Sequence, residues 1–491
     1  MRRSNKEHFV LEARLLASPD IEKQINKRFF IGWRMSNIVT KYAKNQLQKL
    51  HEDKRYRDAL DLYKNTKGDA KKTAGEELKS IVASYRISEY DLQHYIIKQQ
   101  HKYKKFIDSP MAQKIASDVS KGVSKILYST GKRLHFKKLN AFTSLEGKSN
   151  ATGLRLIEDD GWHIEWLGLV APIIVRKKDL VLQQALENND ISYCRIVRKT
   201  FRGGYRYFIQ IVFQGKPPSK HKGRRSPNKR VGADIGTSTI AATNGSKCVL
   251  KQLASGIEKF NQEIEELSTK LEHLRRVGNP NNFNENGTIK RGKKLEWNNS
   301  NNYKRTLRHL KNAYRKRSAF ILESHNKLAN EILALGNEIC TEQMNFKALA
   351  KRAEKTEISE KTGKYESKKR FGKSIESRAP GLFTSILARK LKYRNKELHK
   401  VNTTSFKASK YNHSTNTYTK KELSDRHAEI DGKPIQRDLY SAFLLMNSNP
   451  QLTKTDRELC IKSYPKFKKA HDKCTKEIKK AGQQVPSSFG I

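Results

Sequence analysis

The stretch that decides the fold of this chain is Val231-Gly232-Ala233-Asp234-Ile235-Gly236, an apolar run that carries one carboxylate. The next apolar runs are 239–243 and 248–250, and an Asn244-Gly245 pair lies between them. Apolar and β-branched runs favour strands, and Asn-Gly is the preferred pair for a two-residue hairpin turn. We therefore expect three antiparallel strands to open a domain here, with Asp234 on the first strand.

Further along the chain, two more carboxylates stand at element boundaries. Apolar residues at helical spacing occupy 257–274 and 303–335, which predicts two helices that pack as an antiparallel hairpin. Gly336 is expected to end the second helix, and 338–342 is predicted to be a strand that ends in Glu342. Asp438 opens a last helical pattern.

The order of these three acids, Asp234, Glu342 and Asp438, is that of an RNase H-like nuclease. Clustered carboxylates suit phosphodiester hydrolysis because they hold the metal ions that activate water and stabilise the leaving oxygen. Hard oxygen ligands favour Mg²⁺ or Mn²⁺ over zinc. A single strand aspartate is weak evidence, since most such residues cap turns or face solvent, so the prediction depends on all three acids meeting in one place.

Three motifs in register also resemble a known family, the TnpB transposon-encoded RNA-guided nucleases and the related miniature type V CRISPR effectors. Residues 232–236 resemble the first RuvC motif (G-I-D-L-G), 341–345 the second (E-D-L-N) and 436–442 the third (D-R-D-x-N-A-A). Ala379-Pro380-Gly381 and the helix expected after it match the family too. The resemblance implies an RNA-guided DNA endonuclease that binds a structured guide RNA, reads a short flanking DNA motif and cuts double-stranded target DNA. A single RuvC site would use Asp234, Glu342 and Asp438 as catalytic, Mg²⁺-holding residues.

The sequence departs from that family in two places. The family usually carries a zinc ribbon of two CxxC pairs between the second and third motifs, whereas 403–430 contains no cysteine. We expect a target-nucleic-acid-binding insertion without zinc, in which His413 and His427 are solvated rather than metal ligands. Tyr440 stands where the third motif has Asn, and it is expected to leave Asp438 intact while altering how the last helix packs.

The N-terminal half contains a helical pattern followed by a strand pattern. Ser18-Pro19-Asp20 has an N-cap, a first-turn proline and an acid in helix-start order, and helical patterns continue to residue 132. Alternating runs then predict short antiparallel strands up to a Pro-rich basic linker. The expected fold is a multidomain α+β chain in which an oligonucleotide-binding-like β-barrel with an inserted helical domain precedes an RNase H-like RuvC domain with an inserted helical hairpin.

The domain boundaries follow from these patterns and from the resemblance. The expected parts are a wedge β-barrel (1–16 and 133–225), a helical recognition domain (17–132), the RuvC domain (226–402 and 431–447), the insertion without zinc ligands (403–430) and a basic tail (448–491). The tail is expected either to contact guide RNA or to be disordered.

Composition restricts the partners. The chain has 100 Lys+Arg against 50 Asp+Glu, a formal charge of +50, so its natural partner is a polyanion. No run of roughly 18 apolar residues predicts a membrane span. The five cysteines, none in a CxxC pair, are expected to be free thiols in a reducing cytosol: Cys194, Cys248, Cys340, Cys460 and Cys474. We expect guide RNA and target DNA as partners, no membrane, and a cytoplasmic, nucleoid-associated place in a bacterium.

Two other functions remain open at this stage. A relative that has lost its nuclease residues would act as an RNA-guided DNA-binding repressor, although the presence of all three acids argues against this. A basic structural RNA-binding protein would explain the charge but not the order of the acids. The origin of the guide, from a transposon end or a CRISPR array, the flanking motif and the oligomeric state also stay open.

Overall fold

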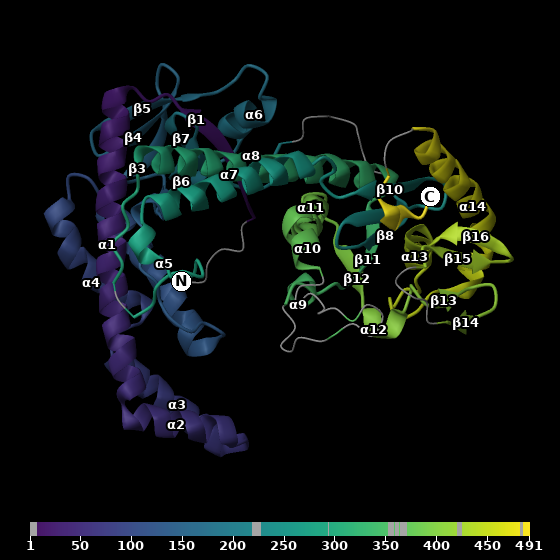
Figure 1. Ribbon diagram of the computed structural model, residues 1–491, viewed down its shortest axis with the longest axis horizontal. Coiled ribbons are helices and arrows are strands. Elements are labelled where there is room, and N and C mark those ends of the chain that lie inside the picture. The colour runs from purple at the N-terminus through teal and green to yellow at the C-terminus, as the bar shows by residue number, and fades with distance from the viewer. Residues whose placement is uncertain are drawn as a thin grey trace. The chain divides into compact units, whose positions relative to one another are not determined.

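The computed structural model describes residues 7–218, 227–292, 294–351, 358, 363, 371–419, 425–481 and 485–491 (Figure 1). The chain divides into two compact units, Met1–Lys220 and His221–Ile491. Each unit combines helices with a sheet, so the protein is a multidomain α+β chain, as predicted. No helix in the described part of the chain is both long and apolar enough to cross a membrane.

The first unit contains a seven-stranded antiparallel sheet in the order β2-β6-β7-β1-β5-β4-β3. Its strands are β1 (His8–Leu15), β2 (Ser144–Glu146), β3 (Leu154–Glu158), β4 (Trp162–Trp166), β5 (Leu169–Ile174), β6 (Ile191–Phe201) and β7 (Gly204–Gln214). Buried and exposed residues alternate along β3, β5 and β7. The sheet curls, because its edge strand β3 contacts β6.

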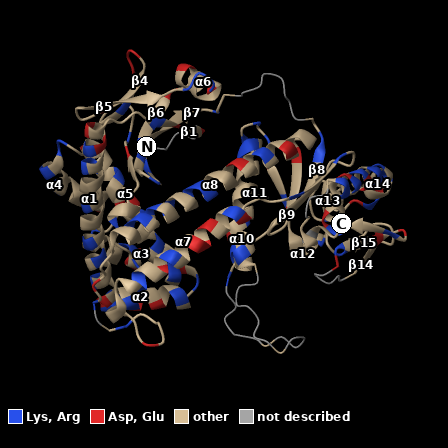
Figure 2. Ribbon diagram, turned by 45° about the horizontal axis from the view of Figure 1, so that its top comes forward, with Lys and Arg blue, Asp and Glu red and all other residues tan. Residues whose placement is uncertain are grey.

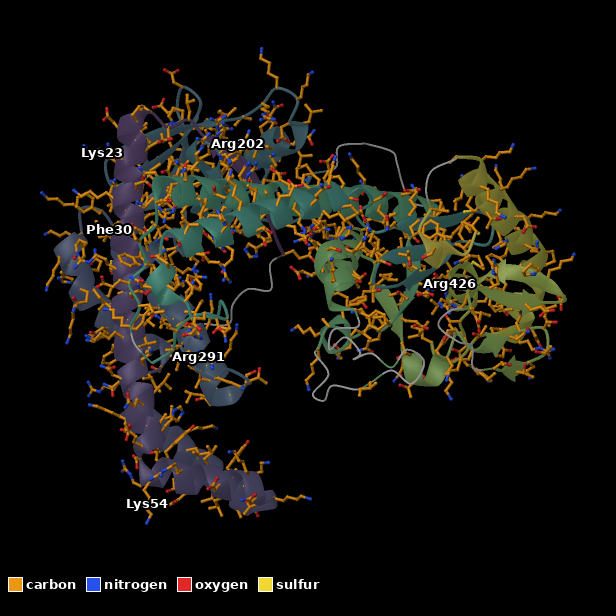
Figure 3. All side chains as sticks on the ribbon, viewed as in Figure 1. Lys23, Phe30, Lys54, Arg202, Arg291 and Arg426 are labelled. Carbon is orange, nitrogen blue, oxygen red and sulfur yellow. The ribbon has the colours of Figure 1, made fainter. Side chains whose placement is uncertain are left out.

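In the first unit, α6 (Leu180–Asn188) lies between β5 and β6, and the other α-helices lie between β1 and β2 in the sequence. These are α1 (Pro19–Glu52), α2 (Lys54–Asn65), α3 (Gly68–Ser84), α4 (Glu89–Gln100) and α5 (Ser109–Tyr128). The predicted helix start is confirmed, because the Ser18 side chain accepts from the Ile21 amide and Pro19 is the first helical residue. Arg28 pins α1 to the sheet by donating to the carbonyls of Trp166 and Leu167 at 3.2 and 3.0 Å. Figure 3 labels Lys23 on α1 near the sheet and Lys54 far from it, where α2 begins.

The second unit is built on a five-stranded sheet in the order β10-β9-β8-β11-β12. The strands are β8 (Arg230–Ile235), β9 (Thr239–Thr243), β10 (Cys248–Gln252), β11 (Glu338–Glu342) and β12 (Leu398–Val401). The first three form the predicted antiparallel meander, and β11 and β12 run parallel to β8. The turn at Asn244-Gly245 is also confirmed, with Gly245 at φ 77°.

Helices cover both faces of this sheet. The predicted hairpin of α7 (Glu258–Val277) and α8 (Asn301–Leu335) is confirmed, and the end of α8 packs with α11 (Pro380–Lys392) on one face. On the other face lie α13 (Arg437–Met446) and α14 (Arg457–Lys480). The remaining elements are α9 (Phe346–Leu349), α10 (Gly372–Arg378), α12 (Thr403–Phe406), β13 (Tyr411–Asn412), β14 (Thr417–Tyr418), β15 (His427–Ile430) and β16 (Lys433–Gln436).

The C-terminal segment corrects one expectation. Disorder was one of two alternatives for the basic tail, and it is wrong for α14. Cys460, Phe467 and Cys474 of this helix are buried in the same core as α13. The lysines that left disorder open occupy the other side of an amphipathic helix, whose apolar stripe packs inward. The predicted free thiols are confirmed for all five cysteines.

Candidate active site

Asp234 lies on the face of the sheet that α13 covers. Successive side chains of a strand point to opposite faces. Val231, Ala233 and Ile235 belong to the core beneath α8 and α11, so Gly232 and Asp234 face the opposite way. One face of β8 therefore packs into the core, and the other face carries the Asp234 carboxylate.

Gly232 allows α13 to lie directly on β8. A Cβ atom at this position would be 1.8 Å from the Ala442 carbonyl oxygen and 2.5 Å from the Met446 amide nitrogen. Both are backbone atoms of the helix, so they cannot turn aside as a flexible side chain would. Glycine is required here by this close approach.

The contact at Gly232 also determines how far along β8 the Asp438 side chain lies. Asp438 precedes Ala442 by one helical turn, about 6 Å along the axis. Asp234 follows Gly232 by two strand residues, about 6.6 Å. Arg230, at the start of β8, donates to the Ser448 carbonyl just beyond α13, so helix and strand run in opposite directions. Asp438 therefore stands beside Asp234.

Glu342 reaches the same place from the neighbouring strand. Strand β11 pairs with β8 in parallel, with Thr341 opposite Ala233. One residue further along this register, Glu342 is beside Asp234. Carboxyl ends of parallel strands meet at one edge of a sheet, which is where ligands of open α/β sheets bind. The structure thus brings all three predicted acids together.

The pKa of Asp234 reflects the nearby negative charges. Its pKa is raised well above the ordinary value, first by desolvation and then by the negative charges of Asp438 and Glu342. Arg437 opposes the shift. Burial also raises the pKa of Glu342. Like charges in a poorly hydrated site repel, so the site favours binding of a cation.

Arg437 is a residue of this site that the sequence analysis missed. Its Nε lies 3.6 Å from Asp438 Oδ1, and both side chains are largely buried. Its position next to Asp438 in the third motif was the one sequence signal that could have identified it as a site residue. Its charge partly offsets the crowding of the acids.

The donor set fits a hard divalent cation, since carboxylate oxygens are the ligands that Mg²⁺ and Mn²⁺ prefer. Among the described residues, no three Asp, Glu, His or Cys side chains already surround one point as metal ligands. The acids are close enough to perturb one another, and a cation would remove the repulsion that raises the pKa of Asp234. The prediction that 403–430 binds no zinc stays a prediction, because residues 420–424 lie outside the described part.

Asp431, seven residues before Asp438 (438 − 431), is another acid that could stand in the third position. It lies in the turn between β15 and β16 at φ 51° and is exposed. The Ser414 hydroxyl donates to its carboxylate. Asp431 is not among the charges that shift the pKa of Asp234. The geometry favours Asp438.

The solvated state expected for His413 is wrong, while His427 is exposed as expected. His413 is only 2% exposed. The Tyr440 hydroxyl accepts from the His413 backbone amide at 3.1 Å and interacts with its Nδ1 at 2.7 Å. Tyr440, the departure from the third motif, therefore ties the 403–430 segment to α13, and this bond holds His413 inside.

No family model and no curated protein matches this sequence. Among solved structures, one likeness is to the Cas12f1–sgRNA–target DNA complex, with 12% identity, a TM-score of 0.48, and coverage of 91% of this chain and 100% of that one. Another is to a CRISPR-Cas12f ternary complex, with 12% identity, a TM-score of 0.24, and coverage of 90% and 87%. The chain is structurally similar to Cas12f.

Proposed function

We propose that this chain is an RNA-guided DNA endonuclease that binds a structured guide RNA, reads a short flanking motif and cleaves target DNA at one metal-dependent RuvC-type site. The observation that carries the proposal is the meeting of Asp234, Glu342 and Asp438 from three elements at one edge of the sheet. The strand order, an antiparallel meander extended by two parallel strands, supports an RNase H-like domain with α7 and α8 inserted.

Each group in the site has a role that follows from its position. Asp234, Glu342 and Asp438 would hold Mg²⁺ or Mn²⁺, which when bound supplies activation of water and stabilisation of the leaving oxygen. Strands β8 and β11 fix two of the acids on a rigid sheet. Arg437 restrains Asp438.

Nucleic-acid binding is proposed to lie mainly in the first unit. Figure 2 shows Lys and Arg along its helices and also along α8 and α14 of the second unit. On the β6–β7 hairpin, Lys199 lies 4.4 Å from the Phe208 ring centroid and Arg206 lies 4.6 Å from that of Phe201. Such basic–aromatic pairs suit phosphate contact and base stacking. The wedge barrel (1–16 and 133–225) and the recognition domain (17–132) remain proposals of the same kind.

The test is the separation of binding from cutting. Asp234→Ala, Glu342→Ala and Asp438→Ala should each lower Mg²⁺-dependent cleavage by at least about 100-fold, since a metal site supplies several kcal/mol of transition-state stabilisation. Guide-directed DNA binding should stay near the wild-type level. Asp431→Ala is the matched control and should cut normally. An inactive Asp431→Ala beside an active Asp438→Ala would show that the third acid is wrongly assigned.

The repressor alternative makes a different prediction for the wild-type chain. A protein that binds its guided target but never cuts with Mg²⁺ or Mn²⁺ would favour it. Guide-independent binding to any structured RNA, with no directed DNA binding, would favour a basic structural RNA-binding protein. The shared position of three acids supports neither alternative.

A further inference from the structure

The helix that carries Asp438 begins at a buried residue. Gln436 is the N-cap of α13 and is 2% exposed. Its side-chain Oε1 accepts from the Leu439 amide at 2.7 Å. An N-cap satisfies an amide that has no partner inside the helix and thereby defines where the helix starts. The position of Gln436 therefore governs the first turn, in which Asp438 lies.

Gln436 is itself held by α14. Its backbone N–H donates to Nε2 of His471 at 3.0 Å, and this bond joins residues 35 positions apart. His471 is 5% exposed. Its Nδ1 lies 2.9 Å from Asp472 Oδ1. Because Nε2 accepts, Nδ1 must carry the proton and donate to Asp472, so the carboxylate selects the tautomer that offers a lone pair to Gln436.

Other contacts keep α14 in place for this role. The Phe467 ring stacks on Phe443 of α13, with centroids 4.4 Å apart. Arg457, in the first turn of α14, donates to the carbonyl oxygens of His413 and Ser414, both at 2.9 Å. Burial lowers the pKa of His471, with Asp472 opposing, which agrees with a neutral ring. The acceptor is thus presented from a helix that is anchored on both sides.

We propose that His471 is a positioning residue for the nuclease site: by accepting the Gln436 N–H it fixes the start of α13 and so the place of Asp438 against Asp234. This inference rests on the proposed function, and it assigns a task in the site to the segment read as a tail. His471 touches neither the acids nor a substrate. It acts through Gln436, two residues before Asp438.

The test compares two replacements in the full chain with guide RNA. His471→Phe keeps a ring against Phe467 but removes the acceptor, whereas His471→Gln retains an acceptor oxygen near the position of Nε2. Single-turnover cleavage should fall about tenfold in His471→Phe, because small misplacements of a reacting group are costly. The Mg²⁺ concentration for half-maximal rate should rise while the Kd for target DNA stays constant.

His471→Gln should recover most of the rate and the Mg²⁺ dependence. His273→Phe is the matched control, since His273 is an exposed histidine on α7, and it should behave as wild type. Wild-type rate and Mg²⁺ dependence in His471→Phe would overturn the proposal. Equal impairment in His471→Gln and His471→Phe would also overturn it, because restoring an acceptor would then recover nothing.

Hydrogen exchange provides a readout that needs no cleavage. Amides 436–439 should exchange faster in His471→Phe than in wild type, His471→Gln or His273→Phe, while amides of β8 keep their protection. Unchanged exchange at 436–439 would refute the positioning role. A wild-type chain that never cuts would instead refute the proposed function, and the exchange result would still decide whether His471 holds this helix. Should His471→Phe lose protection throughout β8, His471→Met is measured in its place, with the same outcomes.

Discussion

Among single side chains, Tyr440 has the clearest structural consequence. Its hydroxyl forms hydrogen bonds with both the backbone amide and Nδ1 of buried His413. Tyr440→Phe removes both bonds and leaves two polar groups of His413 buried without this partner. The free energy of unfolding should fall by about 1–3 kcal/mol, the cost of leaving buried groups unsatisfied. Urea denaturation measures it. Tyr418→Phe, at a tyrosine that is 53% exposed, should change stability little, and equal losses in the two variants would contradict this account.

His413 also predicts a pH dependence of stability. Burial lowers its pKa below the usual 6.5, with Asp431 opposing and Arg457 adding to the shift. The unfolded chain therefore binds a proton at a higher pH than the folded chain. The contribution of His413 to stability is complete above pH 6.5 and is lost as the pH falls toward its folded pKa. Tyr440 and Tyr464 face the ring and stay neutral in this range.

The test is the denaturation midpoint measured between pH 7.5 and 5, about the usual histidine pKa. The midpoint should change less steeply with pH in His413→Gln than in wild type. An unchanged slope would contradict the assignment.

Of the elements, α13 depends most on one close contact. Gly232→Ala would place a Cβ 1.8 Å from the Ala442 carbonyl oxygen, so helix and strand must move apart. The loss of stability should be about 3 kcal/mol or more, the upper end for overpacking. Cleavage should fall further than stability alone explains, since Asp438 moves with the helix. Thermal unfolding and single-turnover cleavage measure the two effects. Gly203→Ala is the control, because a Cβ there meets nothing within 4 Å. A stable, active Gly232→Ala chain would exclude this packing.

For the chain as a whole, the charge of +50 predicts binding that is strongly sensitive to salt. Each phosphate contact releases counterions, so guide-RNA affinity should fall by at least about 10³-fold between 50 and 200 mM salt. Filter-binding titrations of the full chain and of fragment 226–491 check this and locate the contacts. Equal affinity of the fragment and the full chain would contradict the assignment of RNA binding to residues 1–225.

The sequence alone was sufficient for the elements around the acids, because their signals are local. Asn244-Gly245 specified a turn, and apolar runs specified the strands at 231–235 and 338–342. In the first unit, Ser18-Pro19 specified a helix start in the same way. The order of Asp234, Glu342 and Asp438 along these elements was also sufficient to nominate them. Each element was inferred from neighbours a few residues apart, where backbone preference and side-chain period decide the outcome.

Tertiary structure alone decided what depends on distant residues. The buried His413 bonds to Tyr440, the backbone N–H of Gln436 bonds to His471, and the preference for Asp438 over Asp431 follows from the contact at Gly232. None of these contacts produces a periodic pattern in the sequence, because each one joins two residues that are far apart in the chain. The basic composition of the C-terminal segment left disorder open, yet the apolar stripe of α14 is buried. Burial depends on which face of a helix meets the core rather than on composition.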